Sequence, residues 1–247
     1  GALSMDASTK VTLTGGPGDI FVVQSTGALT LGASAVIELE GGVLARNVFW
    51  TPTAATFGAG SKFQGVLLTG SAATYGAGAE HVGHIYAQTH ITMEAGVIIK
   101  ALRCSDAPSM APTSAPTEAP TVEVVEKVGQ ICNYAILSET GVTNTGPLDV
   151  TGDVGVSPIL SSAITGLALK MDDSNEFSAS TMVSGKVMAA DYTSGTTKED
   201  LAASIIAMNE LRTEMSSMPH TTELSVTSLS GLVLEPGVYK YIGALTM

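Results

Sequence analysis

Charged and aromatic residues are scarce in this sequence. Only 14% of its 247 residues are charged and 5% are aromatic, with 11 Lys and Arg against 23 Asp and Glu. Because no cluster of Lys and Arg is present, binding to nucleic-acid phosphates is not expected, and a net charge of -12 makes acidic substrates equally poor partners. No apolar run approaches the roughly 18 residues that span a bilayer, so no membrane segment is expected.

Recognisable sets of catalytic residues are also missing. No combination of Ser, His and Asp and no activated Cys stands out. His81, His84 and His90 lie near Glu80 and Glu94, but His81 and His84 have opposite parity along a strand and are expected to face different sides. We expect solvated histidines at the edges of a fold rather than metal ligands. The sequence therefore predicts a protein that is not an enzyme and that has no cofactor or metal.

Glycine and small apolar residues are abundant. The chain has 27 Gly and is 45% hydrophobic, a composition that favours tightly coiled strands. The sequence AATFGAG from Ala54 returns as AATYGAG from Ala72, a step of 18 residues, and Gly65 and Gly83 repeat the same step. A fixed period of this length predicts a β-solenoid with rungs of about 18 residues.

A pattern of apolar, Thr, apolar recurs in the same register. It is centred on Thr12, Thr30, Thr56, Thr74 and Thr92. Because strand side chains alternate, the apolar neighbours are predicted to point inward and the threonines outward in one column, about 4.8 Å apart. The step of 26 residues between Thr30 and Thr56 predicts an eight-residue insertion in one rung.

This column is the candidate binding site. Small residues such as Ala54 and Gly58 flank the threonines, and a flat row of methyl and hydroxyl groups can order water into a lattice compatible with ice, although Lys10, His90 and Glu94 place charge at the ends. The alternative is a plain solenoid surface, because outward strand positions favour Thr in any case.

Residues 105–130 are predicted to be a linker. Pro108, Pro112, Pro116 and Pro120 recur at a period of four, which favours an extended, semi-rigid spacer. The residue after each proline is a candidate O-glycosylation site: Ser109, Thr113, Thr117 and Thr121. An undecorated spacer is the alternative.

One amphipathic helix is predicted over residues 198–217. The apolar residues at helical spacing are Leu201, Ile205, Met208, Leu211 and Met215. Thr197 is the expected N-cap, Asp200 completes a capping box, and Pro219 ends the helix. The apolar stripe is expected to pack along one side of the solenoid.

Two long stretches resemble the ice-binding-like domain family. NYAILSETGVTNTGPLDVTGDVGVSP from Asn133 and GLVLEPGVYKY from Gly231 resemble its opening half. GDIFVVQSTGALTLGASAVIEL from Gly18, RNVFW from Arg46 and ATFGAGSKFQGVLL from Ala55 resemble its closing half. The resemblance implies a mainly β fold, a right-handed discontinuous β-solenoid with one long helix alongside. The same fold also occurs in chains without ice activity, so it does not decide the function.

The two halves stand in reverse order. Residues 1–104 match the C-terminal half of one domain and residues 131–247 the N-terminal half of the next. GALSM at 1–5 and GALTM at 243–247 are displaced by 242 residues, which predicts a tandem-repeat protein whose neighbouring repeats complete each split domain. A circular permutant or a domain-swapped chain are the alternatives.

The two cysteines stand at the boundaries of these halves. Cys104 ends the closing half and Cys132 begins the opening half, and such a pair in a secreted protein predicts a disulfide. Two pairings are open. Cys132 can bond the Cys104 of its own completed domain, or the two cysteines of this segment can close a loop around the linker.

The sequence favours a secreted, extracellular repeat unit of a structural or adhesive fibre, in which many weak faces give avidity. The alternative is an ice-binding protein that acts through the threonine column. The expected partners are neighbouring repeats of the same protein and ice or another solid surface. The chain starts at Gly1 rather than Met, so any targeting signal is expected outside this segment.

Overall fold

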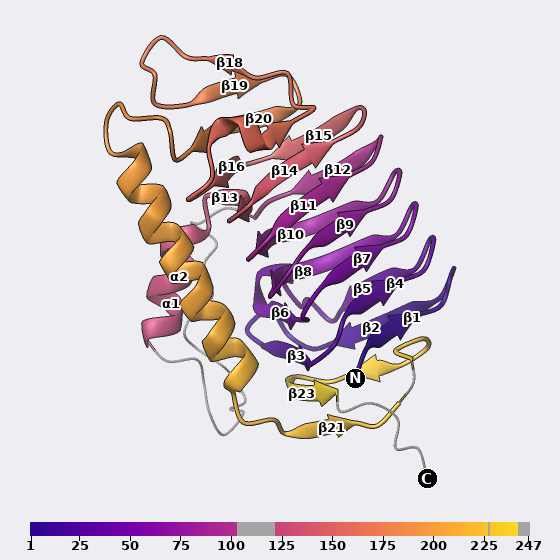
Figure 1. The fold of residues 1–247 in the computed structure, drawn as a ribbon. Helices are drawn as coiled ribbons and strands as arrows, with labels where there is room; N and C mark the ends of the chain where they lie inside the picture. The colour runs from indigo at the N-terminus through magenta and orange to yellow at the C-terminus, as the bar shows by residue number, and fades with distance from the viewer. Residues whose placement is uncertain (103–121, 227, 242–247) are drawn as a thin grey trace.

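Short parallel strands stacked on one another make up most of the protein (Figure 1). The computed structural model describes residues 1–102, 122–226 and 228–241, and of residues 122–126 it describes the backbone alone. Two α-helices accompany the strands in the described part of the chain, and one of them is long. The predicted mainly β fold with one long flanking helix is therefore confirmed, and its arrangement resembles a β-solenoid.

One side of the stack, face one, is a sheet of seven parallel strands. In sheet order they are β1 (Leu3–Met5), β4 (Leu29–Leu31), β7 (Ala55–Phe57), β9 (Ala73–Tyr75), β11 (His90–Met93), β14 (Gly141–Asn144) and β17 (Ile164–Thr165). Side chains alternate along each strand. In β4, for example, Leu29 and Leu31 are buried and Thr30 between them is exposed.

The second sheet covers both remaining sides because its longest strands bend. These are β8 (Lys62–Thr69) and β10 (Glu80–Ala87), which pair in parallel along their whole length. Gly65 and Gly83 pair with each other at the bend, with φ of 125° and 141°, a region that favours glycine. A Cβ on Gly83 would collide with the carbonyl oxygen of Gly65, so the bend requires glycine there.

The bend divides the second sheet into face two and face three. Face two contains β2 (Lys10–Thr14), β5 (Val36–Glu40), the first parts of β8 and β10, β12 (Val97–Lys100), β15 (Leu148–Thr151) and β22 (Val233–Leu234). Face three contains β3 (Phe21–Ser25), β6 (Val48–Thr51), the second parts of β8 and β10, β13 (Tyr134–Ser138), β16 (Asp153–Val156), the second part of β20 (Val183–Ala189), β21 (Thr222–Leu224) and β23 (Gly237–Tyr241). The first part of β20 pairs with β15 in face two. The antiparallel strands β18 (Lys170–Met171) and β19 (Ser178–Ser180) extend beyond β20, and short 3-10 helices span Ala45–Asn47 and Ser161–Ala163.

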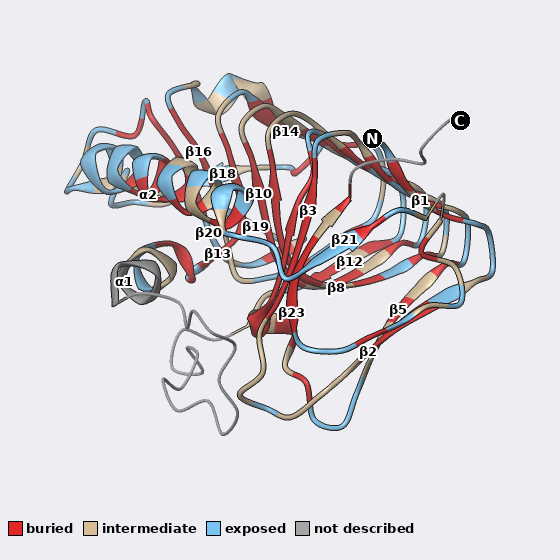
Figure 2. Ribbon diagram, turned by 90° about the horizontal axis from the view of Figure 1, so that it is seen from below, coloured by how far each residue is buried: buried red, intermediate tan, exposed pale blue. Residues whose placement is uncertain are grey.

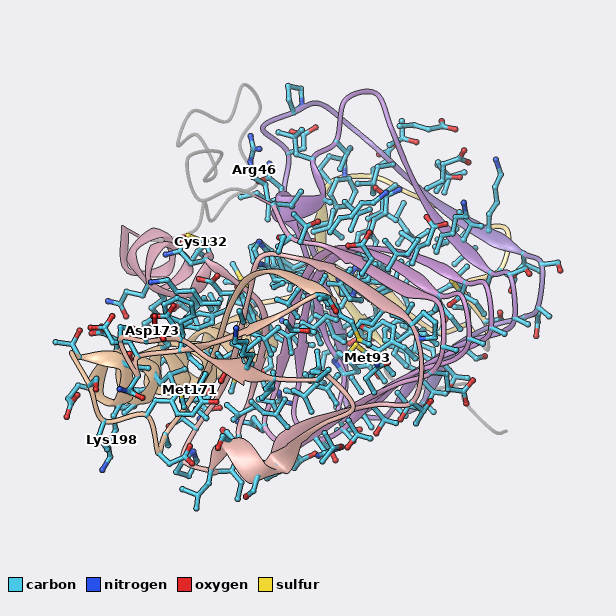
Figure 3. The ribbon with its side chains drawn as sticks, turned by 90° about the horizontal axis from the view of Figure 1, so that it is seen from above. Arg46, Met93, Cys132, Met171, Asp173 and Lys198 are labelled. Atoms are coloured by element: carbon cyan, nitrogen blue, oxygen red, sulfur yellow. The ribbon has the colours of Figure 1, made fainter. Side chains whose placement is uncertain are left out.

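Apolar side chains fill the space between the three faces. The rings of Phe57 and Tyr75, on adjacent rungs, stack with centroids 4.4 Å apart, and Phe63 meets Phe57 edge-on at 4.9 Å. Met93 continues the buried column further along face one, and its position in the interior is labelled in Figure 3. Each large buried side chain contributes about 1.5–3 kcal/mol to stability, so the column of inward residues holds successive rungs together.

The long helix α2 (Thr197–Ser217) lies along face three and presents its exposed side to solvent (Figures 1 and 2). The whole predicted apolar stripe is buried, namely Leu201, Ile205, Met208, Leu211 and Met215. It packs on outward apolar residues of face three, among them Val22, Phe49 and Leu68. The predicted helix and its packing along one side of the stack are therefore confirmed.

The predicted N-cap of α2 is wrong by one residue. The helix already includes Thr197, so Thr196 stands at the cap, where its hydroxyl donates to Asp200 at 2.6 Å. The Thr197 hydroxyl instead donates to the carbonyl oxygen of Glu176 at 3.0 Å. Thr196 and Thr197 are equally good N-cap residues by their local sequence. The contact of Thr197 with Glu176 leaves the cap position to Thr196.

The shorter helix α1 (Val122–Ile131) occupies the last part of the predicted linker, residues 105–130. The linker prediction is therefore wrong from residue 122 onward. Pro120 is the last proline of the series, and beyond it Ile131 is buried against α2 while Lys127 lies 3.3 Å from Glu214. The four prolines of the linker lie outside the described residues.

The two halves of the chain complete each other in this structure. At one end of the stack β13 pairs with β10 and β15 with β12, and at the other end β23 pairs with β3 and β22 with β2. Residues 131–241 thus close a core with residues 3–100 of the same chain, as in a circular permutant. The completion of split domains by neighbouring repeats stays a prediction.

Candidate functional site

Face one carries one column of outward hydroxyl residues. Their Cα atoms pair in register from strand to strand: Ser4, Thr30, Thr56, Thr74, Thr92, Thr143 and Thr165. We call this set the hydroxyl column. Four of the five predicted members, Thr30, Thr56, Thr74 and Thr92, therefore stand in line. With adjacent strands about 4.8 Å apart, seven residues span about 29 Å.

The prediction that Thr12 belongs to this column is wrong. Thr12 lies on β2 in face two, where it pairs with Glu38 on one side and Val233 on the other, and it is 6% exposed. Its local pattern of Val, Thr and Leu is shared by strands of both sheets, so the step of 18 residues from Thr12 to Thr30 links two different faces. Ser4 takes the place that Thr12 was expected to fill.

Three members of the hydroxyl column were missed in the sequence. Ser4 lies between Leu3 and Met5, so a search for apolar, hydroxyl, apolar would have found it. Thr143 and Thr165 follow Val142 and Ile164, but each precedes a residue that is not apolar. Both also belong to the second half of the chain, which a fixed step from Thr92 does not reach.

Glycines keep one flank of the column flat. A Cβ would lie 2.5 to 2.8 Å from a backbone nitrogen of the preceding rung at each of three successive positions, Gly32, Gly58 and Gly76. Each glycine therefore permits two rungs to approach closely where the chain leaves face one. No side chain rises beside Thr30, Thr56 and Thr74 on this flank, whereas the exposed Glu94 takes the corresponding position beside Thr92.

The hydroxyls in the middle of the column are free to bind water. In the described part of the chain, Thr30, Thr56, Thr74 and Thr92 make no side-chain hydrogen bond to the protein, as no contact of their Oγ1 atoms is found there. Toward one end, Thr143 Oγ1 lies 2.9 Å from His90 Nε2 and 3.0 Å from Thr165 Oγ1. The open hydroxyls thus form an uninterrupted central run.

The other faces offer no comparable surface. Face two is charged, with Lys10 bonded to Glu38 at 2.7 Å and Lys62 lying 3.5 Å from Glu80. Face three is covered by α2 (Figure 2). Face one is therefore the side of the stack that is open and that carries no charged residue in its outward column.

The two histidines of β10 are buried, so the prediction of solvated histidines is wrong for both. His81 Nε2 donates to the carbonyl oxygen of Gly65 at 2.8 Å, and Nδ1 accepts from the Tyr75 hydroxyl at 2.7 Å. Burial lowers the pKa of His81 to about 3 and also lowers the pKa of His84. The prediction that the two histidines face different sides is confirmed. His81 faces the interior, and His84 stacks on Tyr86 beneath α2.

The remaining predicted sites fall largely outside the described residues. Cys132 is buried just after α1 (Figure 3), but Cys104 lies outside that description, so their pairing stays a prediction. The four candidate O-glycosylation sites Ser109, Thr113, Thr117 and Thr121 lie outside it as well.

Two searches of the described ranges gave negative results. No group of three or more His, Cys, Asp or Glu side chains there is arranged to hold a metal ion. No described helix combines the length and apolar character needed to cross a bilayer.

Comparisons with known proteins agree on one family. The model of the ice-binding-like family matches residues 2–99 and 136–247. An ice-binding protein of Flammulina populicola is 38% identical over 116 residues, and ice-binding protein K1-A of Typhula ishikariensis is 38% identical over 117 residues. Each of these alignments covers 46% of this chain and 47% of the relative.

A more distant match, an ice-binding protein of Leucosporidium, is 32% identical over 123 residues, or 49% of this chain and 47% of the relative. The chain thus spans about half the length of the curated relatives it matches. No solved structure matches it. The relatives are named for binding and not for catalysis, in accord with the prediction of a protein that is not an enzyme. Since the family model covers both halves of the stack, this chain belongs to the ice-binding-like family.

Proposed function

We propose that this protein binds ice through face one. The observation that carries the proposal is the register of the hydroxyl column, which places Thr30, Thr56, Thr74 and Thr92 on four adjacent strands with hydroxyls that lack a protein partner. The names of the relatives support ice as the ligand. This proposal takes precedence over a purely structural role.

The chemistry of the column suits water that is ordered on a surface. Each threonine offers a hydroxyl that donates and accepts, beside a methyl group that does not, and each is fixed at χ1 by its branched Cβ. Rows about 4.8 Å apart present these groups at a regular spacing. Water held by such a row loses less entropy on freezing than water at an irregular surface, because the bridging positions are already set.

The finer features of the fold belong to the same proposal. We infer a right-handed, discontinuous coil, in which the chain climbs from β1 to β12, starts again at β13 and returns along α2. The 18-residue step from Thr56 to Thr74 and from Thr74 to Thr92 is its regular rung. A secreted location accords with an ice-binding role.

A second candidate function is a repeat unit of an extracellular structural or adhesive fibre. It is favoured by the match of GALSM at 1–5 with GALTM at 243–247 and by the proline series of the linker. Both functions are compatible, since a row of ice-binding faces would act as an ice adhesin. The size of the native protein in solution tests the fibre, which would be contradicted by a soluble monomer of one domain.

The ice proposal is tested by thermal hysteresis and by the shape of ice crystals grown in the protein. Thr56→Tyr and Thr74→Tyr each place a bulky ring in the middle of the column. Both are expected to abolish crystal shaping without changing the thermal unfolding midpoint, since both threonines are exposed.

Thr151→Tyr is the matched control. Thr151 is exposed at the end of β15 on face two, so the same substitution there should leave ice activity intact. Wild-type protein that neither shapes ice nor shows hysteresis at high concentration would rule out the proposal. Equal losses of ice activity in all three variants would show that face one is not the ice-binding surface.

A further inference from the structure

A pocket of about 350 Å³ opens beside the last turns of α2, on face three and away from the hydroxyl column. Its lining is polar and basic: Gln24, Ser25, Thr26, Thr51, Thr53, Arg212, Ser216 and Lys240. No Asp or Glu is among these residues. The whole chain has 11 Lys and Arg against 23 Asp and Glu. A pocket with two basic residues and no acidic residue therefore differs in charge from the chain as a whole.

The register of face three places the floor of this pocket. Lys240 on β23 pairs with Gln24 on β3, and Gln24 pairs with Thr51 on β6. The three side chains therefore form one row across three adjacent strands, on the side that faces α2. Gln24 is fixed there, because its Nε2 donates to the carbonyl oxygens of Met215 at 2.8 Å and Met218 at 2.9 Å.

The wall of the pocket is the edge of α2 that carries Arg212 and, one turn later, Ser216. The Arg212 guanidinium donates through Nη2 to the carbonyl oxygen of Pro52 at 3.3 Å. Gly70 leaves room for it, since a Cβ at that position would collide with the guanidinium. The strand turns of face three thus hold the cation at the rim of the pocket.

Arg212 has a charge without a counterion. Among the described residues no carboxylate lies within 4.0 Å of it, and its Nε is buried without a hydrogen-bond partner. Burial lowers its pKa, with no acidic neighbour to oppose the shift. A guanidinium remains charged under these conditions. An acceptor from outside the chain would therefore stabilise the N–H groups of Arg212 that have no partner in the protein.

Thr51 supplies a second and independent unmet group. It is 1% exposed, and its Oγ1 has no hydrogen-bond partner although it lines the pocket. A buried hydroxyl without a partner is energetically unfavourable, and a ligand that bonded to it in the pocket would remove that cost. Thr51 stands on the same row as Gln24 and Lys240.

We propose that this pocket binds an oxyanion group, the carboxylate or sulfate of a small acidic ligand. Arg212 supplies paired N–H donors and Lys240 a second positive charge, the combination that recognises planar and tetrahedral oxyanions. The hydroxyl of Thr51 completes the donor set, whereas the Ser216 hydroxyl at the wall already donates to the carbonyl oxygen of Thr213 at 3.0 Å. The volume exceeds that of a bare ion and is of the order of a sugar-sized ligand, so the anion is either free or carried on an acidic sugar.

The test uses the whole chain and backbone amide NMR, with titrations of sodium sulfate, sodium glucuronate and glucose at constant ionic strength. Saturable shifts centred on Thr51, Thr53 and Ser216 are expected with an anion and not with glucose. Saturation by both anions indicates recognition of the group itself, whereas saturation by glucuronate alone indicates a sugar-borne anion. Arg212→Gln and Lys240→Gln should each raise the dissociation constant about tenfold or more.

Thr51→Val keeps the shape of the side chain and should weaken binding without removing a charge. Lys62→Gln removes a distant cation on face two and should leave the titration unchanged. The proposal is overturned if neither anion gives saturable shifts at these residues, if glucose gives the same shifts, or if both pocket variants bind as the wild type does.

Discussion

Inside the stack, the Tyr75 hydroxyl lies 2.7 Å from His81 Nδ1, and the opposite nitrogen of the same ring lies 2.8 Å from the carbonyl oxygen of Gly65. Because a carbonyl can only accept, Nε2 carries a proton. Because burial lowers the pKa of His81 to about 3, Nδ1 is unprotonated and accepts from the tyrosine. The ring is therefore neutral and links two adjacent rungs through the core.

We expect the folded protein to lose stability as the pH falls below 6.5. The pKa of His81 is lowered to about 3 by burial, so its contribution is fully present above the unfolded value of 6.5 and is lost between 6.5 and 3. At pH 4.5 the loss from this residue is about 2–3 kcal/mol. Urea unfolding of the wild type and of His81→Gln at pH 7 and pH 4.5 measures it. The amide side chain can keep both hydrogen bonds, so the variant should show a smaller difference between the two pH values.

The control for this measurement is His220→Gln. His220 is exposed and lies outside the core, so this variant makes the same change of histidine to glutamine away from Tyr75 and Gly65. An identical dependence in His81→Gln and the wild type would show that His81 binds protons equally in the folded and unfolded states, which contradicts a lowered pKa in the core.

Substitution of the bend glycine should be far more damaging than substitution of a turn glycine with the same sign of φ. Gly83→Ala puts a methyl group against the carbonyl oxygen of Gly65 and is expected to destabilise the protein by about 3 kcal/mol or more. Gly78 has φ of 67°, and a Cβ on it would have no atom within 4 Å, so Gly78→Ala should cost only about 1 kcal/mol. Denaturant midpoints of the two variants measure the difference, and similar midpoints would contradict the steric account of the bend.

The ends of the hydroxyl column should respond in opposite directions. Ser4→Thr adds the missing methyl group and is expected to raise thermal hysteresis, whereas Thr165→Tyr adds a ring at the far end and should lower it less than Thr56→Tyr does. Thermal hysteresis at equal protein concentration compares the three. Unchanged activity in Ser4→Thr would mean that the effective surface ends at Thr30.

The 247-residue chain should fold by itself as a monomer. Every strand of residues 131–241 that pairs across the halves finds its partner in residues 3–100 of the same chain, for example β23 with β3. Light scattering together with one cooperative unfolding transition tests this. Dimers or larger species that form by exchange of halves would instead support completion by neighbouring repeats.

Much of face one could be predicted from the sequence because the same residue types recur at the 18-residue length of one rung. Thr56, Thr74 and Thr92 could be aligned by eye for this reason. Thr12 could not be separated from them, because the identity of the sheet depends on how many residues the turns between rungs contain. Alternation also predicted that His81 and His84 face opposite sides, but not that the core and α2 would bury both.

The joining of the halves and the pocket at Arg212 could not be read from local patterns. Both depend on pairs of residues that are far apart in the chain, such as Lys240 with Gln24. The helix α2 was predictable from its apolar stripe, whereas α1 was hidden by the proline series that precedes it.

The length of α2 sets a limit on how tall the stack can be. Its 21 residues extend about 31 Å. It touches β20 near one end and β3 near the other, and these are the outer two of seven strands in sheet order, so they lie about 29 Å apart. The length of the helix thus matches the height of the seven strands that it covers. An additional rung would add about 5 Å to the height of the stack, and α2 would need about three more residues to cover it. The extent of face one along the stack is therefore tied to the length of a helix on the opposite side of the molecule.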